Sequence, residues 1–237
     1  MHMKPFAVRE AIRFGWETFK KRPWFFIWTM FVFNLLSNFN FNTQSEDTAF
    51  PDLSPWMIAL MVIAGIVLTV IAVLANMARN RFLLKAQREP EAVGFQESWK
   101  LEKFWRFLFA GLLKGGVIGI PALVLFAIAY FSYPNMLLLV PCVALGFAWI
   151  VFTSIRLMFV ELIVLDTDMT AVQSLRESER ITRGEFWHLV VFGLALGGVM
   201  ILGLLALVVG LLVAVPVTSL AFVHVYRALK AAPQVQA

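Results

Sequence analysis

Long apolar segments alternate with short polar ones along this chain of 237 residues. Crossing the hydrocarbon core of a bilayer takes roughly 20 apolar residues, because a helix rises 1.5 Å per residue. Six segments come close to this length, and the pattern therefore predicts an all-α, polytopic bundle of six transmembrane helices. The predicted spans are residues 24–41, 56–77, 107–131, 136–155, 187–207 and 211–229.

The last two spans form one run that contains no Asp, Glu, Lys or Arg between Trp187 and Tyr226. A single helix over residues 187–229 would be about 65 Å long, twice the thickness of the hydrocarbon core. The chain must therefore fold back, and we expect the turn near Gly210. A re-entrant hairpin is the alternative interpretation.

The basic residues predict the orientation of the spans. Of the 20 lysines and arginines, all except Lys114 lie in segments that the six spans would place on the same side of the membrane. The segment 42–55, between the first two spans, contains Glu46, Asp47 and Asp52 but no base. Lysine and arginine are retained on the cytoplasmic side, so the pattern predicts a cytoplasmic-membrane protein with both termini in the cytoplasm.

A threefold internal repeat is a further hypothesis within one integral membrane domain, 1–237. The units would be residues 5–88, 89–168 and 169–230. Each unit begins with an Ala-Val pair and continues through basic residues to an aromatic residue at the start of a span. Each unit ends at a basic residue on the span that returns. The pairs are Ala7-Val8, Ala92-Val93 and Ala171-Val172, the aromatic residues are Trp24, Trp105 and Trp187, and the closing bases are Arg79, Arg156 and Arg227.

A polar segment opens each unit, and the first has the clearest helical pattern. Its apolar side chains recur with the 3.6-residue period of one helix face. They are Val8, Ala11, Ile12, Gly15, Trp16 and Phe19. We expect a helix in the membrane plane with this stripe among acyl chains, ended by Pro23. For the third unit, an ordinary cytoplasmic linker helix is an equal alternative.

Composition agrees with a bilayer as the solvent. Hydrophobic residues make up 60% of the chain and charged residues 15%, against about 25% in ordinary soluble domains. The net charge of +5 arises from bases that flank apolar runs, so it indicates anionic lipid headgroups rather than nucleic acid. The lone cysteine, Cys142, lies in an apolar stretch as a packing residue, and the sequence predicts no metal or cofactor.

Three charged residues fall inside or at the ends of predicted spans: Lys114, Arg156 and Glu161. Lys114 lies about 12 Å along its helix from Arg106. A charge within a span costs several kcal/mol unless it pairs, snorkels or meets water. We therefore advance the hypothesis that Lys114 and Glu161 face each other inside the bundle. The alternative is that both snorkel to the cytoplasmic interface.

Other polar and small residues suggest helix contacts. Asn34 and Asn38 lie one turn apart and could line a polar seam, or simply bond between helices. Glycines at four-residue spacing indicate faces where helices pack closely, rather than phosphate loops. They are Gly111, Gly115 and Gly119, with Gly193 and Gly197. We expect four tryptophans, Trp16, Trp24, Trp105 and Trp187, at the membrane interface.

The segment 156–229 resembles a mostly uncharacterised family of bacterial six-helix membrane proteins, related to the membrane domain of glycerophosphoryl diester phosphodiesterases. The matching residues are Val164-Leu165-Asp166, Ala171, Ser174 to Ser178, Thr182 to Trp187, Val209 to Val213, Pro216, Tyr226 and Leu229, with Phe6 to Trp24 at the N-terminus. The resemblance implies six spans with interfacial helices. It transfers neither a catalytic activity nor site residues.

The sequence favours a non-enzymatic function. The three histidines, His2, His188 and His224, belong to no metal-binding motif, and no cluster of acids accompanies them. We expect a protein that acts through contacts with lipids, such as specific anionic lipids, or with partner proteins, in membrane or envelope homeostasis. The alternative is a transporter or channel for a small solute or lipid. An enzyme acting on lipid headgroups is the third hypothesis.

Overall fold

The computed structural model describes residues 6–37, 54–133 and 135–232. This part of the chain is helical, apart from turns and short connections. The elements in chain order are α1 (Val8–Lys21), α2 (Pro23–Ser37), α3 (Pro55–Arg88), the 3₁₀ turn η1 (Gln96–Ser98), α4 (Phe104–Phe131), α5 (Met136–Arg156), α6 (Val160–Asp166), α7 (Ala171–Thr182), α8 (Phe186–Leu205) and α9 (Leu207–Ala231).

Within the described residues, five helices are long and apolar enough to cross a membrane, which makes this a multi-pass membrane protein. They cover Trp56–Arg88, Phe104–Phe131, Met136–Asp166, Phe186–Leu205 and Gly210–Ala231. The remaining predicted span, residues 24–41, is the first in the chain and corresponds to α2. Its described part has 15 residues, about 22 Å of helix, and the end of the predicted span lies outside the described residues.

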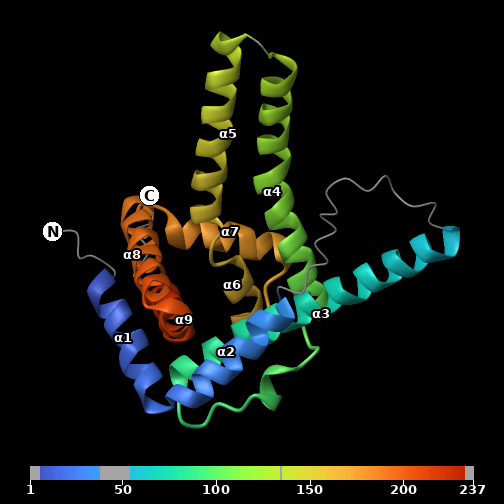
Figure 1. Cartoon of the computed structure of the whole chain (residues 1–237). Coiled ribbons are helices and arrows are strands. Elements are labelled where there is room, and N and C mark those ends of the chain that lie inside the picture. The colour runs from blue at the N-terminus through green and yellow to red at the C-terminus, as the bar shows by residue number, and fades with distance from the viewer. Residues whose placement is uncertain (1–5, 38–53, 134, 233–237) are drawn as a thin grey trace.

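Three helix pairs extend from a common base (Figure 1). They are α2 with α3, α4 with α5, and α8 with α9. The α4–α5 hairpin stands away from the rest, and the N-terminal half of α3 extends in another direction. Helix α7 lies across the base of the α4–α5 hairpin, and α1 runs beside α8 and α9.

Local signals in the sequence set several helix boundaries. Pro23 occupies the first position of α2, where its missing N–H costs nothing. Thr170 and Gln173 form a capping box at the start of α7, since each side chain bonds the other residue's backbone N–H. Gly184 has a φ of 87° and turns the chain from α7 into α8, a conformation that glycine adopts without strain.

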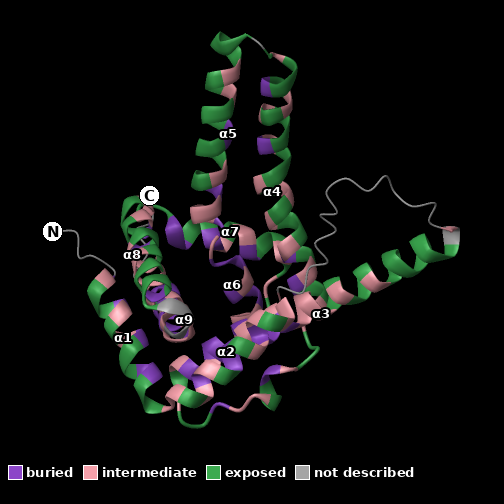
Figure 2. Cartoon of the chain, viewed as in Figure 1, coloured by how far each residue is buried: buried purple, intermediate pink, exposed green. Residues whose placement is uncertain are grey.

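The packed core lies at the base of the bundle. Figure 2 shows buried residues there and exposed residues along the far parts of α3, α4 and α5. Phe82, Phe159, Leu220 and Tyr226 are fully buried. In contrast, Trp56, Ile63 and Leu123 are each more than 60% exposed. The basic ends of the spans are therefore joined by protein packing, while the opposite ends present apolar side chains to their surroundings.

Hydrogen bonds from arginine side chains also bring the basic segments together. The Arg22 guanidinium donates to the Glu91 carbonyl, which joins the α1–α2 turn to the segment after α3. Arg106 donates to the Asp168 carbonyl and ties the start of α4 to the loop after α6. Segments that the sequence assigns to one side of the membrane thus meet in space. Which side is cytoplasmic stays a prediction.

The turn between the last two spans is at Ala206, four residues earlier than predicted. Gly210 lies instead in the first turns of α9. A Cβ on Gly210 would lie 2.2 Å from the Gly203 carbonyl oxygen, so the two helices meet there at backbone distance. The absence of a side chain at Gly210 allows α8 and α9 to approach closely and does not form the turn itself. Helix α8 has 20 residues, the length of a full span.

The amphipathic stripe of α1 packs differently from the prediction. Ala11, Gly15 and Phe19 are buried, and Gly15 lies directly against the backbone of α9 at Val217. Most of the stripe is therefore covered by protein, and Trp16, 45% exposed, lies at its edge. A repeating pattern at helical spacing predicts an apolar face but does not say whether protein or lipid covers it.

The helix order agrees with the threefold repeat hypothesis in one respect, which is that the long helices occur as three pairs. A helix precedes the first and third pairs, whereas the second is preceded by η1 and a turn at Lys103 with a φ of 69°. Residues 101–103, directly before α4, are not helical. The short helix α6 has no counterpart after α3 or α9 within the described residues. Internal repetition therefore stays a prediction.

Candidate functional site

Lys114 and Glu161 lie together inside the bundle. The Lys114 ammonium is 3.0 Å from a carboxylate oxygen of Glu161, and the two side chains are 24% and 30% exposed. Helix α4 supplies the lysine and α6 supplies the glutamate. On the same two helices, Phe107, Ala110 and Val160 are buried in one hydrophobic cluster.

Helix α3 completes this charged centre. The Asn80 amide donates to the other carboxylate oxygen of Glu161 at 3.1 Å, and Asn80 is itself buried. The neighbouring Arg79 adds a favourable electrostatic interaction with Glu161. The Glu161 carboxylate thus links α3 to α4 through α6. Its pairing lowers the several kcal/mol that an isolated charge would cost within a span.

Asn80 is not among the predicted site residues, although the sequence carries a signal for a polar contact there. Asn80 directly follows Arg79, the base that marks the end of the first return helix. A polar amide one residue from a basic cluster, on a helix longer than a span, indicates a polar contact near the interface. Sequence alone could not show that its partner lies 81 positions away in α6.

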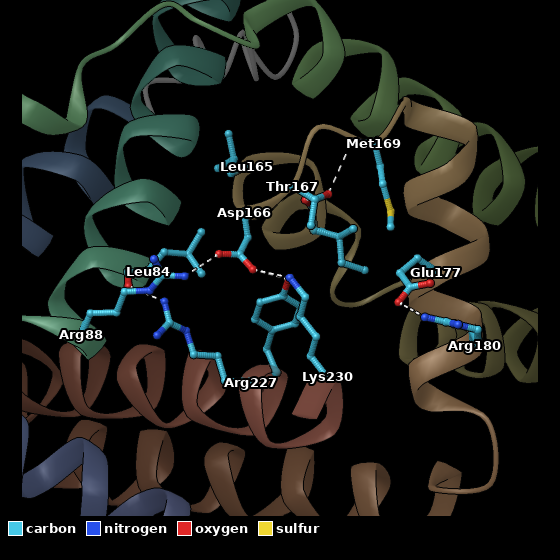
Figure 3. Close-up of polar contacts among 12 residues, drawn as sticks. Leu84, Arg88, Leu165, Asp166, Thr167, Met169, Glu177, Arg180, Arg227 and Lys230 are labelled. Atoms are coloured by element: carbon cyan, nitrogen blue, oxygen red, sulfur yellow. Dashed lines mark hydrogen bonds and ion pairs between the residues drawn. The ribbon is translucent and has the colours of Figure 1, made fainter. Parts of the chain in front are cut away.

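A second polar cluster surrounds Asp166 at the end of α6 (Figure 3). Its carboxylate accepts from the Lys230 ammonium at 2.5 Å and from the Tyr226 hydroxyl at 3.1 Å, both on α9. The other oxygen accepts from Arg88 of α3 at 3.3 Å. The Asp166 side chain is only 12% exposed. One carboxylate therefore joins the C-terminal ends of α3, α6 and α9.

Arg227 extends this cluster. Its guanidinium donates to the Leu84 carbonyl at 3.0 Å, which adds a second link between α9 and α3. Three cations, Arg88, Arg227 and Lys230, surround Asp166, and Arg227 and Arg88 repel each other. Their mutual repulsion makes the Asp166 charge the element that holds the three helix ends together.

Asp168, two residues further on, makes an exposed contact with α4. Its carboxylate lies 3.0 Å from the Lys103 ammonium and 3.9 Å from Arg106. The hydrogen bond from Lys103 and the Lys103 charge hold the pKa of Asp168 below its ordinary value, with a smaller contribution from Arg106. Lys103 also donates to the Thr167 carbonyl at 2.6 Å. The loop after α6 is therefore fixed to the start of α4 by several contacts.

Arg156 closes α5 and anchors α7. Its carbonyl accepts from the Ser178 hydroxyl at 2.8 Å, and its guanidinium lies 3.6 Å from Glu179. The same guanidinium lies over the Phe152 ring, 5.0 Å from the centroid. Arg156 does not join Lys114 and Glu161; it contacts the helix that follows them.

The remaining predicted residues are placed as follows. Asn34 is half-buried and donates to the Met30 carbonyl one turn back at 2.9 Å. Asn38 lies outside the described residues. Three of the tryptophans lie near the start of a helix pair and are 66% to 75% exposed: Trp24, Trp105 and Trp187. Trp16, in α1, is 45% exposed.

The predicted close packing at five glycines is not made within the described chain. A Cβ added at Gly111, Gly115, Gly119, Gly193 or Gly197 would meet nothing within 4 Å. Close approaches occur instead at Gly15, Gly203 and Gly210. Small-residue spacing predicts that a helix face can be approached, but the partner helix depends on the tertiary arrangement.

The chemistry of these centres is ion pairing. Each carboxylate is neutralised by a cation or donor from another helix, which suits a structural link or a polar path through the membrane. His188 lies 2.9 Å from Glu185 in the first turn of α8, and the His224 ring stacks on Phe14. Neither histidine contacts the two carboxylate centres in the described structure. No protein family model, curated protein or solved structure matches this chain.

Proposed function

We propose that this protein is a non-enzymatic component of the cytoplasmic membrane that acts through contacts with lipids or partner proteins, in membrane or envelope homeostasis. The observation that carries the proposal is the split between a packed base and splayed, apolar outer ends. In lipid no hydrophobic force drives helices together, so exposed apolar faces are available for lateral contacts.

The outer half of α3 illustrates this availability. Along the 56–70 segment most of its large side chains are exposed, among them Leu60, Ile63 and Ile66 at about 60%. A helix held only at one end can meet lipid or another helix along its whole outer length. The six-span topology, with both termini in the cytoplasm, and the relationship to the bacterial six-helix family belong to the same proposal.

Native mass spectrometry of the full chain, purified in mild detergent, tests the proposal. We expect lipid or a partner at fixed stoichiometry, and we expect stripping of that component to lower the thermal unfolding midpoint. A chain that carries neither, and whose midpoint is the same in zwitterionic and anionic nanodiscs, would contradict it.

The Lys114–Glu161 centre favours a second candidate, transport of a small solute or lipid. Opposite charges within spans recur along ion and proton paths. Single cysteines at Lys114, Glu161, Asn34 and Asn38, in a chain whose Cys142 is replaced by serine, would report a hydrated path. Reaction with a water-soluble thiol reagent at several of these positions supports transport, and uniform protection counts against it.

A further inference from the structure

A hollow of about 220 Å³ lies on the exposed face of α7. Its lining residues are Arg176, Glu179, Arg180 and Arg183. The spacing of three, four and seven residues places them on one face of the helix. The volume exceeds that of several water molecules, at about 30 Å³ each, and leaves room for a phosphate group.

The charges around this hollow do not balance. The Glu179 carboxylate is already occupied by Arg156, at 3.6 Å. Figure 3 shows the Arg180 guanidinium paired with Glu177. The distance between their nitrogen and oxygen atoms is 2.6 Å. Within the described residues Arg176 and Arg183 have no carboxylate within ion-pair distance. Two guanidinium groups on one face therefore lack a counter-charge.

The helix that carries them is fixed in place. The hydroxyls of Ser178 and Thr182 donate to the Arg156 carbonyl at 2.8 and 3.4 Å, and both residues are buried. The capping box holds the other end of α7. A site on such a helix is preorganised, so that little free energy is lost in ordering the helix when an anion binds.

The hollow also lies where the chain meets the membrane. Arg183 is followed at once by the Gly184 turn and by α8, whose Trp187 is 75% exposed. Phe186 contacts Phe152 near the end of α5, with ring centroids 5.5 Å apart. The arginines thus lie beside the ends of two spans, where we expect lipid phosphates.

We propose that Arg176 and Arg183, with Arg180 between them, bind the phosphate of an anionic phospholipid headgroup. Guanidinium groups match phosphate oxygens with two parallel hydrogen bonds, which ammonium groups cannot. A free phosphate or phosphate monoester offers the same chemistry. The inference rests on the proposed function and names the lipid class and the place of contact.

The test is a binding titration of the purified full chain in nonionic detergent. The probes are dioctanoyl phosphatidylglycerol, dioctanoyl phosphatidylcholine and inorganic phosphate. We expect phosphatidylglycerol to bind, phosphatidylcholine not to, and Arg176→Gln/Arg183→Gln to weaken phosphatidylglycerol binding about tenfold or more. The double variant Arg9→Gln/Lys100→Gln removes the same charge from exposed positions elsewhere and should change the affinity about twofold or less.

The inorganic phosphate arm identifies the source of the phosphate. If phosphate binds as tightly as phosphatidylglycerol and competes with it, the ligand is a free phosphate compound. Should the Gln variant not fold, Arg176→Lys/Arg183→Lys keeps the charge and should still bind about threefold more weakly, because the bidentate geometry is lost. Undiminished phosphatidylglycerol binding in the variants, or equal binding of phosphatidylcholine, would overturn the site.

These outcomes separate the two proposals. A wild-type chain that retains lipid while the arginine variants bind phosphatidylglycerol normally removes the α7 site but leaves the lipid-contact function intact. A wild-type chain that retains neither lipid nor a partner removes the function itself.

Discussion

The Lys114 ammonium on α4 lies 3.0 Å from the Glu161 carboxylate on α6, inside the part of the chain that spans the membrane. Asn80 of α3 binds the other oxygen of the same carboxylate. Three helices thus depend on one charge that would be costly to leave alone. The contact gives the first prediction.

Lys114→Ala and Glu161→Ala are expected to destabilise the chain non-additively. Each single change leaves a partly buried charge unpaired and should cost roughly 1–3 kcal/mol, whereas the double variant should recover about 1 kcal/mol of the summed loss. Thermal or chemical unfolding in one detergent measures the cycle. The matched control is the exposed pair Arg13 and Glu17 on α1, where a smaller coupling is expected. Additive, small effects at Lys114 and Glu161 would mean that both side chains snorkel independently.

Asp166→Asn should loosen the base of the bundle. The change removes the charge that Lys230 and Arg88 share and leaves their cations facing Arg227, so we expect a loss of roughly 2–4 kcal/mol. Asp168→Asn is the matched control, because its carboxylate is 89% exposed and its loss should cost less. Equal midpoints of unfolding for the two variants would show that the Asp166 charge does not hold the ends of α3, α6 and α9 together.

The pH dependence of stability should carry a contribution from Asp168. Lys103 holds the pKa of this carboxyl below its ordinary value of about 3.9. The stabilisation is therefore complete above that value and is lost as the pH falls through the lower folded-state pKa. Unfolding midpoints measured between pH 7 and pH 2 should differ between the wild type and Asp168→Asn at neutral pH and converge at the acid end. A constant difference across the range would contradict the assignment.

Gly15→Ala should destabilise the packing of α1 on α9. The new Cβ would lie 2.4 Å from the Val217 carbonyl oxygen, a backbone atom that cannot move aside cheaply. We expect a loss of about 1–3 kcal/mol, as for other overpacked positions. Gly111→Ala is the matched control, since nothing lies within 4 Å of its new methyl group and alanine favours the helix by about 0.5–1 kcal/mol. A loss of similar size at both glycines would place the effect in the helix backbone rather than in the contact.

The sequence predicted local properties better than contacts. Apolar length predicted six spans, of which five are helices of spanning length within the described residues, and the bases marked the ends that meet at the base of the bundle. The predicted turn at Gly210 is wrong, since the missing side chain of Gly210 allows the backbone of α9 to approach Gly203 and the turn itself lies at Ala206. The stripe of α1 was identified, but its cover by α9 could not be, since lipid and protein select the same apolar side chains.

The two carboxylates show the same limit. Glu161 and Lys114 stood out because charges are rare in spans. Asp166 did not, because an acid at a helix end ordinarily faces water. Its importance arises from the meeting of α3 and α9, whose contributing residues lie 78 and 60 positions away. Such long-range convergence leaves no periodic signal in a single sequence.

The most direct measurement is the sidedness of two single cysteines, in a chain whose Cys142 is replaced by serine. Lys100→Cys lies at the packed base, between η1 and α4, and Tyr133→Cys lies at the far end of the α4–α5 hairpin, 70% exposed. With a membrane-impermeant thiol reagent, the two cysteines should be labelled from opposite faces of sealed vesicles. Labelling of both from the same face would contradict the arrangement of a protein-packed base on one side of the membrane and spans that leave it.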